Sequence, residues 1–563
     1  MSGPLPNDGS PSSMADLLVA RADDDHPGLR FEEQQWSWRQ VISASTCRAS
    51  WIRSVTDAGP LHLGVLLGNV PEHLFWLGAA GLSGAAVVGI NATRRGDGLA
   101  GDILRTDCRA IITDAEGARL LDGLEFGVPA DRIICVDSTE YAGMLEPHVG
   151  ADPHRLVSAS APSPGDLYLL LFTSGTTGSP KAVRCTQGRL ASIAARAADG
   201  YGFDRDDVAY CTMPLFHGNA LMALWGPSLA VGATVALARR FSASGFLPDV
   251  RRHGATTFTY VGKALAYVLA TPPDADDAGT TLQRGFGTEA SVADHAAFER
   301  RFGCVLTEGY GSSEGGVAIS RTVDTPTGSL GRPFEGVAIV DPATMKECPP
   351  AVFDAGGALV NGHAAIGEIV NRTGVGGFEG YYADEEATAA RTRNGWYWTG
   401  DLAYRDEAGF FYFAGRRGDW MRVDSENLTA GPIERVLVRF EDVAAVAVYS
   451  VADPRSGDQV MAALEMLPGR AFDAEGFSDF LASQPDLGTK WAPSFVRVSG
   501  GLPQTASGKV TKDPLRAEGW WGGSDPIFRR RRAARAYALM ENGDRRELRA
   551  EFRRHGREAL VGG

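Results

Sequence analysis

Short apolar runs alternate along most of the chain with alanine-rich stretches of helical character. The runs are rich in β-branched or other apolar residues and lie at 110–112, 132–136, 167–172, 234–237 and 257–260. Continuous apolar runs of this length are typical of strands buried on both faces, and helical stretches separate them here. The pattern therefore predicts α/β layers whose strands are mostly parallel.

The longest apolar run, 74–90, has the minimum length of a membrane span. It contains four glycines and follows directly on Pro71, Glu72 and His73. We interpret it as a buried helix that leads into a strand at 85–90. Residues 1–16 lack the basic and apolar regions of a signal peptide. We therefore expect a cytoplasmic protein without a transmembrane segment.

Two further segments suggest how the chain is divided. Residues 151–165 are rich in Ser, Pro and Asp and are expected to form a loop before the strand at 167–172. Residues 402–404 and 410–414 flank a turn at 406–409 and are expected to form a hairpin. The glycine and charged residues after this hairpin are typical of a linker, which is followed by about 100 residues of mixed α and β character.

Charge and composition exclude some classes of function. The 563 residues have a net charge of −14, which disfavours nucleic acid as a partner. The seven cysteines are scattered singly, so neither a disulfide framework nor a zinc site is expected. Six of the 55 basic residues are lysine, so a lysine in a motif is informative.

The strongest local signal is a polar loop at 173–181, directly after the strand at 167–172. Its sequence is TSGTTGSPK. Glycines let backbone N–H groups face an anion, hydroxyls add donors, and lysine adds a compact positive charge. A strand followed by such a loop predicts a phosphate-binding site, although the spacing is not that of a Walker A loop.

The segment 173–181 resembles the phosphate-loop signature of the adenylate-forming (AMP-binding) superfamily, which includes the acyl-CoA synthetases. Five further segments resemble motifs of this family and follow in the family's order. They are 214–217 for the acyl pocket, 310–314 for adenine and magnesium, 397–401 for ribose, 415–416 for the hinge and 503–509 for a C-terminal catalytic lysine. Segments 68–72 and 90–96 look like the fatty-acid-transport-protein and very-long-chain branch.

The resemblance implies a large N-terminal domain of stacked α/β layers and a small, mobile α+β C-terminal domain. The implied bounds are a flexible N-terminus at 1–16, the N-terminal adenylation domain at 17–415, a hinge at 416–418, the mobile domain at 419–520 and an arginine-rich extension at 521–563. The arginines of this extension alternate with acidic residues, so a solvated, salt-bridged helix is expected there.

The function implied is ATP-dependent activation of a fatty or fatty-like carboxylic acid to acyl-AMP, with release of pyrophosphate, followed by transfer to CoA. ATP, Mg²⁺, CoA and a small-molecule acid are the expected ligands, and a homodimer is compatible with the sequence. The lysines at 181 and 509 fall where the motifs require lysine. Arginine's planar fork does not replace a compact ammonium in a crowded phosphate site.

The family's site residues carry over to this chain as follows. The implied ATP-binding residues are Thr173, Ser174, Gly175, Thr176, Thr177, Gly178, Lys181, Gly287, Thr288, Glu289, Tyr310, Gly311, Ser312, Asp401 and Arg416. The implied catalytic residues are Lys509, which would bridge the carboxylate and α-phosphate, Glu314, which would bind Mg²⁺, and Ser313, which would offer a hydroxyl. His217 and Gly309 are expected to line the acyl pocket.

The hinge segment departs from the family's pattern. Gly418 stands where the family usually has Asp or Lys, and Ser425 stands where it usually has glycine beside the pantetheine tunnel. A side chain at Ser425 could narrow that tunnel, because glycine tolerates the closest backbone approach. An enzyme weighted to adenylation, with thioester formation slow or done by a partner, is therefore the alternative.

Two competing motifs are weighed against this interpretation. Residues 311–315 fit the G-x-S-x-G elbow of α/β-hydrolases, which would leave the phosphate loop unexplained. Residues 285–290 fit a dinucleotide-binding pattern, but no convincing strand precedes them, so we reject that reading.

Overall fold

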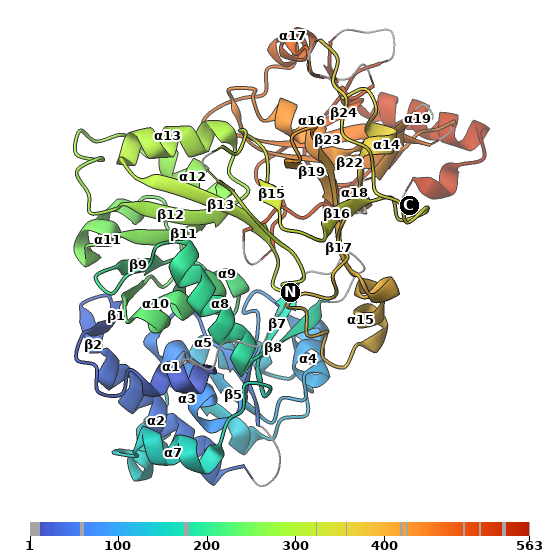
Figure 1. The fold of residues 1–563 in the computed structure, drawn as a ribbon. Helices are drawn as coiled ribbons and strands as arrows, with labels where there is room; N and C mark the ends of the chain where they lie inside the picture. Colours follow the sequence, from blue (N-terminus) through green and yellow to red (C-terminus); the bar gives the residue numbers. More distant parts are fainter. Residues whose placement is uncertain are drawn as a thin grey trace.

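The computed structural model in Figure 1 describes most of the chain. The described residues are 12–56, 61–173, 180–322, 324–355, 357, 359–416, 420–423, 426–455, 457–487, 490–505, 508–531 and 536–561. The sheets and helices below are those of this part of the chain.

One sheet has nine strands in the order β15-β14-β13-β12-β11-β9-β10-β1-β2. The bounds are β1 Pro27–Phe31, β2 Gln34–Ser37, β9 Val208–Cys211, β10 Thr234–Leu237, β11 Thr257–Val261, β12 Arg284–Thr288, β13 Val305–Gly311, β14 Ala318–Ser320 and β15 Arg332–Pro333. The central strands β13, β12, β11, β9, β10 and β1 are parallel, and β2, β14 and β15 are antiparallel additions.

A second sheet has six strands in the order β6-β5-β3-β4-β7-β8. The bounds are β3 His62–Leu66, β4 Ala86–Gly89, β5 Ala110–Thr113, β6 Ile133–Cys135, β7 Leu167–Thr173 and β8 Lys181–Thr186. All neighbours are parallel except β7 and β8. The strands expected from the apolar runs are all present in these two sheets.

Helices fill the space between the two sheets and cover both outer faces, so the α/β layers predicted from the sequence are confirmed. One apolar core joins both sheets to α1 Met14–Val19, α2 Trp38–Ser54, α3 Pro71–Ser83, α8 Gln187–Gly200 and α10 Gly226–Val231. The outer face of the nine-stranded sheet packs against α11 Phe246–His253, α12 Gly262–Leu269 and α13 Val292–Phe302. The outer face of the six-stranded sheet packs against α4 Gly96–Arg105 and α5 Ala115–Leu121.

Helix α3 explains the long apolar run. It is buried almost throughout and leads into strand β4. A Cβ on Gly78 would lie 2.4 Å from the Ser45 hydroxyl of α2, so the glycine allows the two helices to approach closely. The run is therefore a core helix, and none of the helices in the described ranges is long and apolar enough to span a bilayer.

The prediction of a loop at 151–165 is wrong for the first half of this segment. Residues Pro153–Ser160 form the helix α7, next to α6 Thr139–Leu145. Asp152 caps α7 by accepting hydrogen bonds from the backbone N–H groups of His154 and Arg155, and Pro153 occupies the first turn. These polar residues are helix-start residues as well as loop residues, and composition alone did not separate the two.

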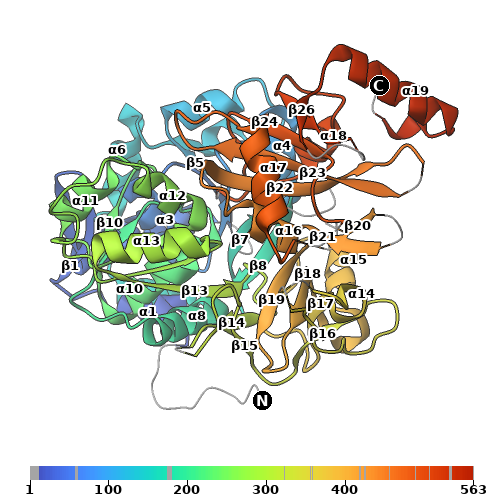
Figure 2. The ribbon, with the colours of Figure 1, turned by 90° about the horizontal axis from the view of Figure 1, so that it is seen from above.

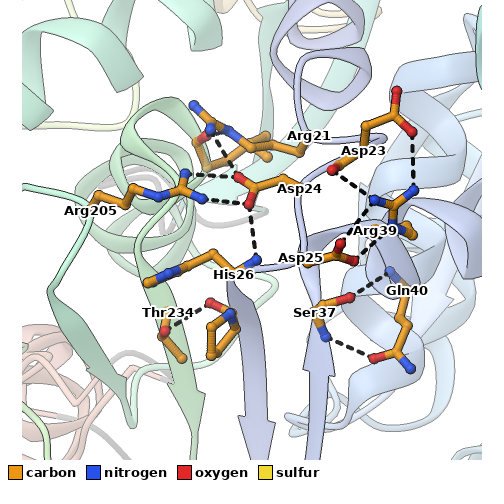
Figure 3. A network of polar contacts seen from close by, with 12 residues as sticks. Arg21, Asp23, Asp24, Asp25, His26, Ser37, Arg39, Gln40, Arg205 and Thr234 are labelled. Atoms are coloured by element: carbon orange, nitrogen blue, oxygen red, sulfur yellow. Dashed lines mark hydrogen bonds and ion pairs between the residues drawn. The ribbon is translucent and has the colours of Figure 1, made fainter.

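Strand β1 is fastened to the sheet by a polar network (Figure 3). Asp24 accepts hydrogen bonds from Arg205 at 2.5 and 2.9 Å and from Arg21 at 3.1 Å. The Arg205 guanidinium holds the pKa of Asp24 well below its usual range. Thr234 donates to the Pro27 carbonyl at 2.8 Å, which ties β10 to the start of β1.

Beyond β15 the chain forms a four-stranded antiparallel sheet in the order β16-β17-β18-β19. The bounds are β16 Val337–Val340, β17 Gly367–Asn371, β18 Tyr397–Arg405 and β19 Phe411–Arg416, with α14 Gly362–Ala365 and α15 Glu385–Arg391 between them. Strands β18 and β19 pair antiparallel around a turn, so the expected hairpin is confirmed.

The C-terminal part is built on a five-stranded sheet in the order β22-β23-β24-β25-β26 and a short pair β20-β21. The bounds are β20 Trp420–Val423, β21 Glu426–Thr429, β22 Val443–Ala452, β23 Asp458–Met466, β24 Phe495–Ser499, β25 Ile527–Arg529 and β26 Ala538–Leu539, with helices α16 Ala430–Leu437, α17 Ala474–Ser483, α18 Asp513–Glu518 and α19 Asn542–Arg554. Figures 1 and 2 show these elements and the four-stranded sheet on the same side of the nine-stranded sheet.

The arginine-rich residues after 521 add to this C-terminal sheet. Strand β25 pairs with β24, and α19 buries Leu548 and Phe552 in the same core as Trp520. The exposed face of α19 is salt-bridged as expected, with Arg531 bonded to Asp544 at 2.8 Å. The expectation of a solvated helix therefore holds for one face of α19 only. The pattern of arginines predicted that charged face, but it gave no information about the residues that the opposite face buries.

We predict that Phe552→Ala destabilises the C-terminal sheet by about 3–5 kcal/mol, because it removes a fully buried aromatic side chain from a packed core. The measurement is the urea-unfolding midpoint of the full-length protein. The matched control is Arg546→Ala, which truncates an exposed residue of the same helix. Equal midpoints for the two variants would contradict the assignment of α19 to the core.

Candidate active site

The predicted site residues come from four parts of the chain: the two large sheets, the four-stranded sheet and the C-terminal domain. Thr173 ends β7 of the six-stranded sheet, and Thr288 and Gly311 end β12 and β13 of the nine-stranded sheet. In α/β sheets, ligands bind outside the carboxyl ends of parallel strands. Asp401 comes from the four-stranded sheet and Lys509 from the C-terminal domain, so the site lies where all these units meet.

The phosphate-binding loop begins and ends at adjacent backbone positions. Thr173 of β7 pairs with Lys181 of β8 in the antiparallel register, so these two residues lie side by side. Lys181 holds its ammonium 5.4 Å from the centre of the Tyr381 ring, a cation–π geometry. The predicted residues Ser174, Gly175, Thr176, Thr177 and Gly178 lie outside the described residues.

Glu314 lies beside the first residue of this loop. Its Oε1 accepts hydrogen bonds from the Tyr381 hydroxyl at 3.1 Å and from the Thr173 hydroxyl at 3.4 Å. The residue is buried, with 7% of its surface exposed. A buried carboxylate next to a phosphate loop fits a hard divalent cation such as Mg²⁺, which prefers oxygen ligands.

Ser313 connects the nucleotide side of the site to the acyl motif. A Cβ on Gly218 would lie 2.8 Å from the Ser313 hydroxyl, so this hydroxyl faces the start of the short helix α9 Gly218–Ala220. The Ser313 carbonyl accepts a hydrogen bond from Arg189 at 2.5 Å. Strand β13 and the turn at 312–315 are followed by strand β14 and no helix. The strand–turn–helix context of a hydrolase elbow is therefore absent here.

Tyr310 and Asp401, the residues expected to bind adenine and ribose, together form one corner of the candidate site. The Tyr310 hydroxyl donates to Asp401 Oδ2 at 2.7 Å, and Arg416 Nε lies 3.9 Å from Asp401 Oδ1. Burial raises the pKa of Asp401, and the Arg416 charge opposes that shift. This corner thus holds a carboxylate, which could accept hydrogen bonds from ribose hydroxyls, next to an aromatic ring, on which a base could stack.

The segment 285–288 forms strand β12, so its glycines are not a dinucleotide loop. A Cβ on Gly287 would lie 2.4 Å from the Tyr260 ring on β11. Glycine is therefore needed for the close packing of β12 on β11. The dinucleotide pattern arises here from sheet packing and not from a phosphate contact.

Lys509 reaches the site from the C-terminal domain. Its Nζ lies 2.8 Å from Glu289 Oε1, across the boundary between the two domains. Glu289 directly follows β12 and has φ of 68°, a left-handed conformation that is uncommon outside glycine. Desolvation acts to raise the pKa of Glu289, whose side chain is half exposed, but the Lys509 charge and hydrogen bond outweigh it and the pKa is lowered.

His217 lies next to this ion pair. Burial lowers the pKa of its imidazole to about 4, and the nearby Lys509 charge acts in the same direction. Its Nδ1 accepts a hydrogen bond from the Asn219 backbone at 3.2 Å, which caps α9. A π-helix at Leu221–Trp225 continues the chain behind α9, an irregularity that is frequent at functional sites.

The aromatic ring of Phe286 lies against Gly309, the second residue expected in the acyl pocket. A Cβ on Gly309 would lie 3.4 Å from the Phe286 ring, and Phe286 stacks on Tyr201 with ring centres 3.8 Å apart. Of the hinge residues, Arg416 is described by the structure, whereas Gly418 and Ser425 lie outside the described residues.

Two positioning residues were not identified as site residues from the sequence. Buried Asn69 donates to the carbonyls of Met213 and Ala238 and accepts from the Leu215 backbone, which holds the acyl motif in place. Glu308 accepts a hydrogen bond from the Ala290 backbone at 2.8 Å, next to Glu289. Asn69 lies in the segment 68–72, whose resemblance to the family could have identified it. No sequence motif pointed to Glu308.

Comparisons with known proteins agree with this geometry. The family model of the AMP-binding enzymes matches residues 18–382, and that of the AMP-binding enzyme C-terminal domain matches residues 432–509. A steroid-22-oyl-CoA synthetase of Rhodococcus jostii (strain RHA1) is 53% identical over 98% of this chain and 99% of its own length. A medium/long-chain-fatty-acid–CoA ligase, FadD17, of Mycobacterium tuberculosis (strain ATCC 25618 / H37Rv) is 48% identical over 92% and 99%.

More distant proteins share the fold and the expected branch. Long-chain fatty acid transport protein 5 of Homo sapiens is 31% identical over 86% of this chain and 75% of its own length. The crystal structure of an anthranilate CoA ligase in complex with anthranoyl-AMP superposes with a TM-score of 0.78 at 20% identity, over 90% of this chain and 96% of that one. The relatives that cover almost the whole chain are CoA synthetases or ligases, which favours the two-step reaction over the adenylation-weighted and hydrolase alternatives.

This chain therefore belongs to the AMP-binding enzymes and is an acyl-CoA ligase, which uses ATP, Mg²⁺ and CoA to convert a carboxylic acid first to acyl-AMP and then to acyl-CoA.

Proposed function

We propose that the chain activates a large apolar carboxylic acid, with a steroid carboxylate as the first candidate, and that Lys509 is the catalytic residue of adenylation. The observation that carries the catalytic assignment is the contact of Lys509 with Glu289, beside His217. It places a mobile ammonium between the expected acyl pocket and the end of strand β12. An ammonium there can stabilise the negative charge that develops when a carboxylate attacks the α-phosphate.

The other site residues have complementary roles in this proposal. Thr173, Lys181 and the loop between them hold the β- and γ-phosphates, and Glu314 binds the Mg²⁺ that ATP brings. Tyr310 stacks on adenine, Asp401 accepts the ribose hydroxyls and Arg416 assists. Their positions support these roles because Thr173, at the end of β7, contacts Glu314, and Tyr310, near the end of β13, contacts Asp401.

The proposal for the acid rests on relatives and on the pocket wall. The two relatives that cover nearly the whole chain are named for a steroid acid and for medium- and long-chain fatty acids. Gly309 leaves the Phe286 ring uncovered by a side chain at that position, which favours a flat or bulky apolar group.

We place the enzyme in the cytoplasm, where ATP and CoA are available. Nucleic acid is not a proposed partner, and a homodimer stays a prediction for light scattering to test.

We expect Lys509→Arg to lower the rate of pyrophosphate release by about a hundredfold or more, because a planar guanidinium does not replace the ammonium that contacts the reacting groups. The measurement is pyrophosphate release with saturating acid and ATP. Lys346→Arg is the matched control, because it makes the same change at an exposed lysine. Near-normal pyrophosphate release from Lys509→Arg, with the fold intact, would overturn the assignment.

A substrate panel tests the proposed acid. We expect a steroid carboxylate with its acyl carbon at C22 to have a kcat/KM about tenfold or more above that of a small aromatic acid, because unfilled apolar pocket volume weakens transition-state binding. The panel compares that acid, a medium-chain and a long-chain fatty acid, and benzoate by acyl-CoA formation. A preference for benzoate would refute a large apolar pocket, and a preference for a fatty acid would refute the steroid assignment.

The lowered pKa of His217 makes a prediction for pH dependence. Since burial lowers that pKa to about 4, the imidazole is neutral at neutral pH and gains its proton only as the pH falls toward 4. We expect His217→Asn to lower kcat/KM by about tenfold and to leave the shape of the profile unchanged between about pH 5 and pH 8. His154→Asn, at an exposed position, is the control. A wild-type inflection near pH 6.5 that disappears in His217→Asn would contradict the neutral imidazole.

A further inference from the structure

A buried ion pair joins the N-terminal domain to the C-terminal domain. Lys263 Nζ on helix α12 lies 2.8 Å from Glu465 Oε2 on strand β23. The two side chains are only 9% and 8% exposed. The Tyr267 hydroxyl, one turn further along α12, donates to Glu465 Oε1 at 3.1 Å. Both carboxylate oxygens of Glu465 are therefore bonded to the N-terminal domain.

The same carboxylate holds the start of the segment that carries Lys509. The Leu502 backbone N–H donates to Glu465 Oε2 at 2.8 Å. From there the chain folds back on itself, since Thr511 donates to the Pro503 carbonyl at 2.8 Å and Thr505 to the Lys509 carbonyl at 2.7 Å. Glu465 is thus the point where the ion pair and the Lys509 segment are connected.

Helix α12 is also fixed against the contact that Lys509 makes. A Cβ on Gly262, the first residue of α12, would lie 2.0 Å from the Glu289 carbonyl oxygen. A Cβ on Gly508 would lie 3.2 Å from Val261, the residue before the helix. The start of α12 therefore packs against both Glu289 and the turn that precedes Lys509.

The two lysine pairs that cross the domain boundary differ in exposure, and this difference separates their roles. Lys509 and Glu289 are 29% and 50% exposed, and partly exposed pairs contribute little and exchange partners readily. Lys263 and Glu465 are buried, and breaking a buried pair leaves an uncompensated charge. The buried pair can hold the domain orientation while Lys509 is released to a substrate.

We propose that Lys263 is a positioning residue for adenylation, because its ion pair with Glu465 holds the Leu502–Lys509 segment within reach of the site. This inference rests on the role proposed above for Lys509. It predicts that the two half-reactions respond differently. Adenylation requires Lys509 at the site, whereas transfer of the acyl group from preformed acyl-AMP to CoA does not depend on this pair.

The test uses Lys263→Met, Glu465→Gln and the double variant in the full-length protein. We expect Lys263→Met to lower kcat for pyrophosphate release by about a hundredfold, because the buried Glu465 carboxylate then lacks its cationic partner. Glu465→Gln keeps an oxygen that can accept from Leu502, so the double variant should recover part of the loss. This recovery is the coupling that a double-mutant cycle measures. Lys346→Met, which removes an exposed lysine, should behave as wild type.

The second readout is acyl-CoA formation from purified acyl-AMP and CoA, which Lys263→Met should leave within about twofold, a change small against the hundredfold expected for adenylation. A loss of similar size in both half-reactions would show a merely structural role and would overturn the inference. Unchanged pyrophosphate release in Lys263→Met would overturn it as well. If Lys509→Arg also releases pyrophosphate normally, both the proposed catalytic role of Lys509 and the positioning role of Lys263 are refuted. If only Lys509→Arg is inactive, that role stands and the role of Lys263 alone is refuted.

Discussion

The contact of the C-terminal domain with the N-terminal domain is the constraint on which the candidate site depends, because it brings Lys509 of one domain to Glu289 at a strand end of the other. Lys509 and Glu289 are 220 residues apart in the chain and belong to different domains. The phosphate loop, the adenine corner and the acyl motif are all within the N-terminal domain. In the proposed function, they form a site for adenylation when the C-terminal domain is oriented so that Lys509 faces them.

Hydrogen bonds and one ion pair satisfy the carboxylates of the candidate site. Each acidic group has a partner that it can exchange: Glu314 accepts from Thr173 and Tyr381, Asp401 from Tyr310, and Glu289 from Lys509. A buried carboxylate without partners would be costly, whereas one bonded to hydroxyls can take a cation with little rearrangement. The groups proposed to bind ATP therefore stabilise one another.

Several sequence predictions depended on local patterns and were confirmed for that reason. The apolar runs gave the strands of both large sheets, and the 74–90 run is a core helix because its glycines let α3 pack against α2. The errors arose where one local pattern fits two structures. Residues 153–160 carry turn-forming residues that also start helices, and the charges of α19 conceal an apolar face that packs on Trp520.

The sequence by itself determined the family, the order of its motifs and the lysines at 181 and 509, because these depend on which residues stand together along the chain. It also indicated the α/β class, since buried parallel strands require long apolar runs. Only the tertiary structure decided that Asn69 supports the acyl motif, that the half-buried His217 lies near Lys509, and that Lys263 and Glu465 meet between the domains. The physical reason is that burial and ion pairing join residues far apart in the chain, and no local pattern encodes which distant side chain will be the partner.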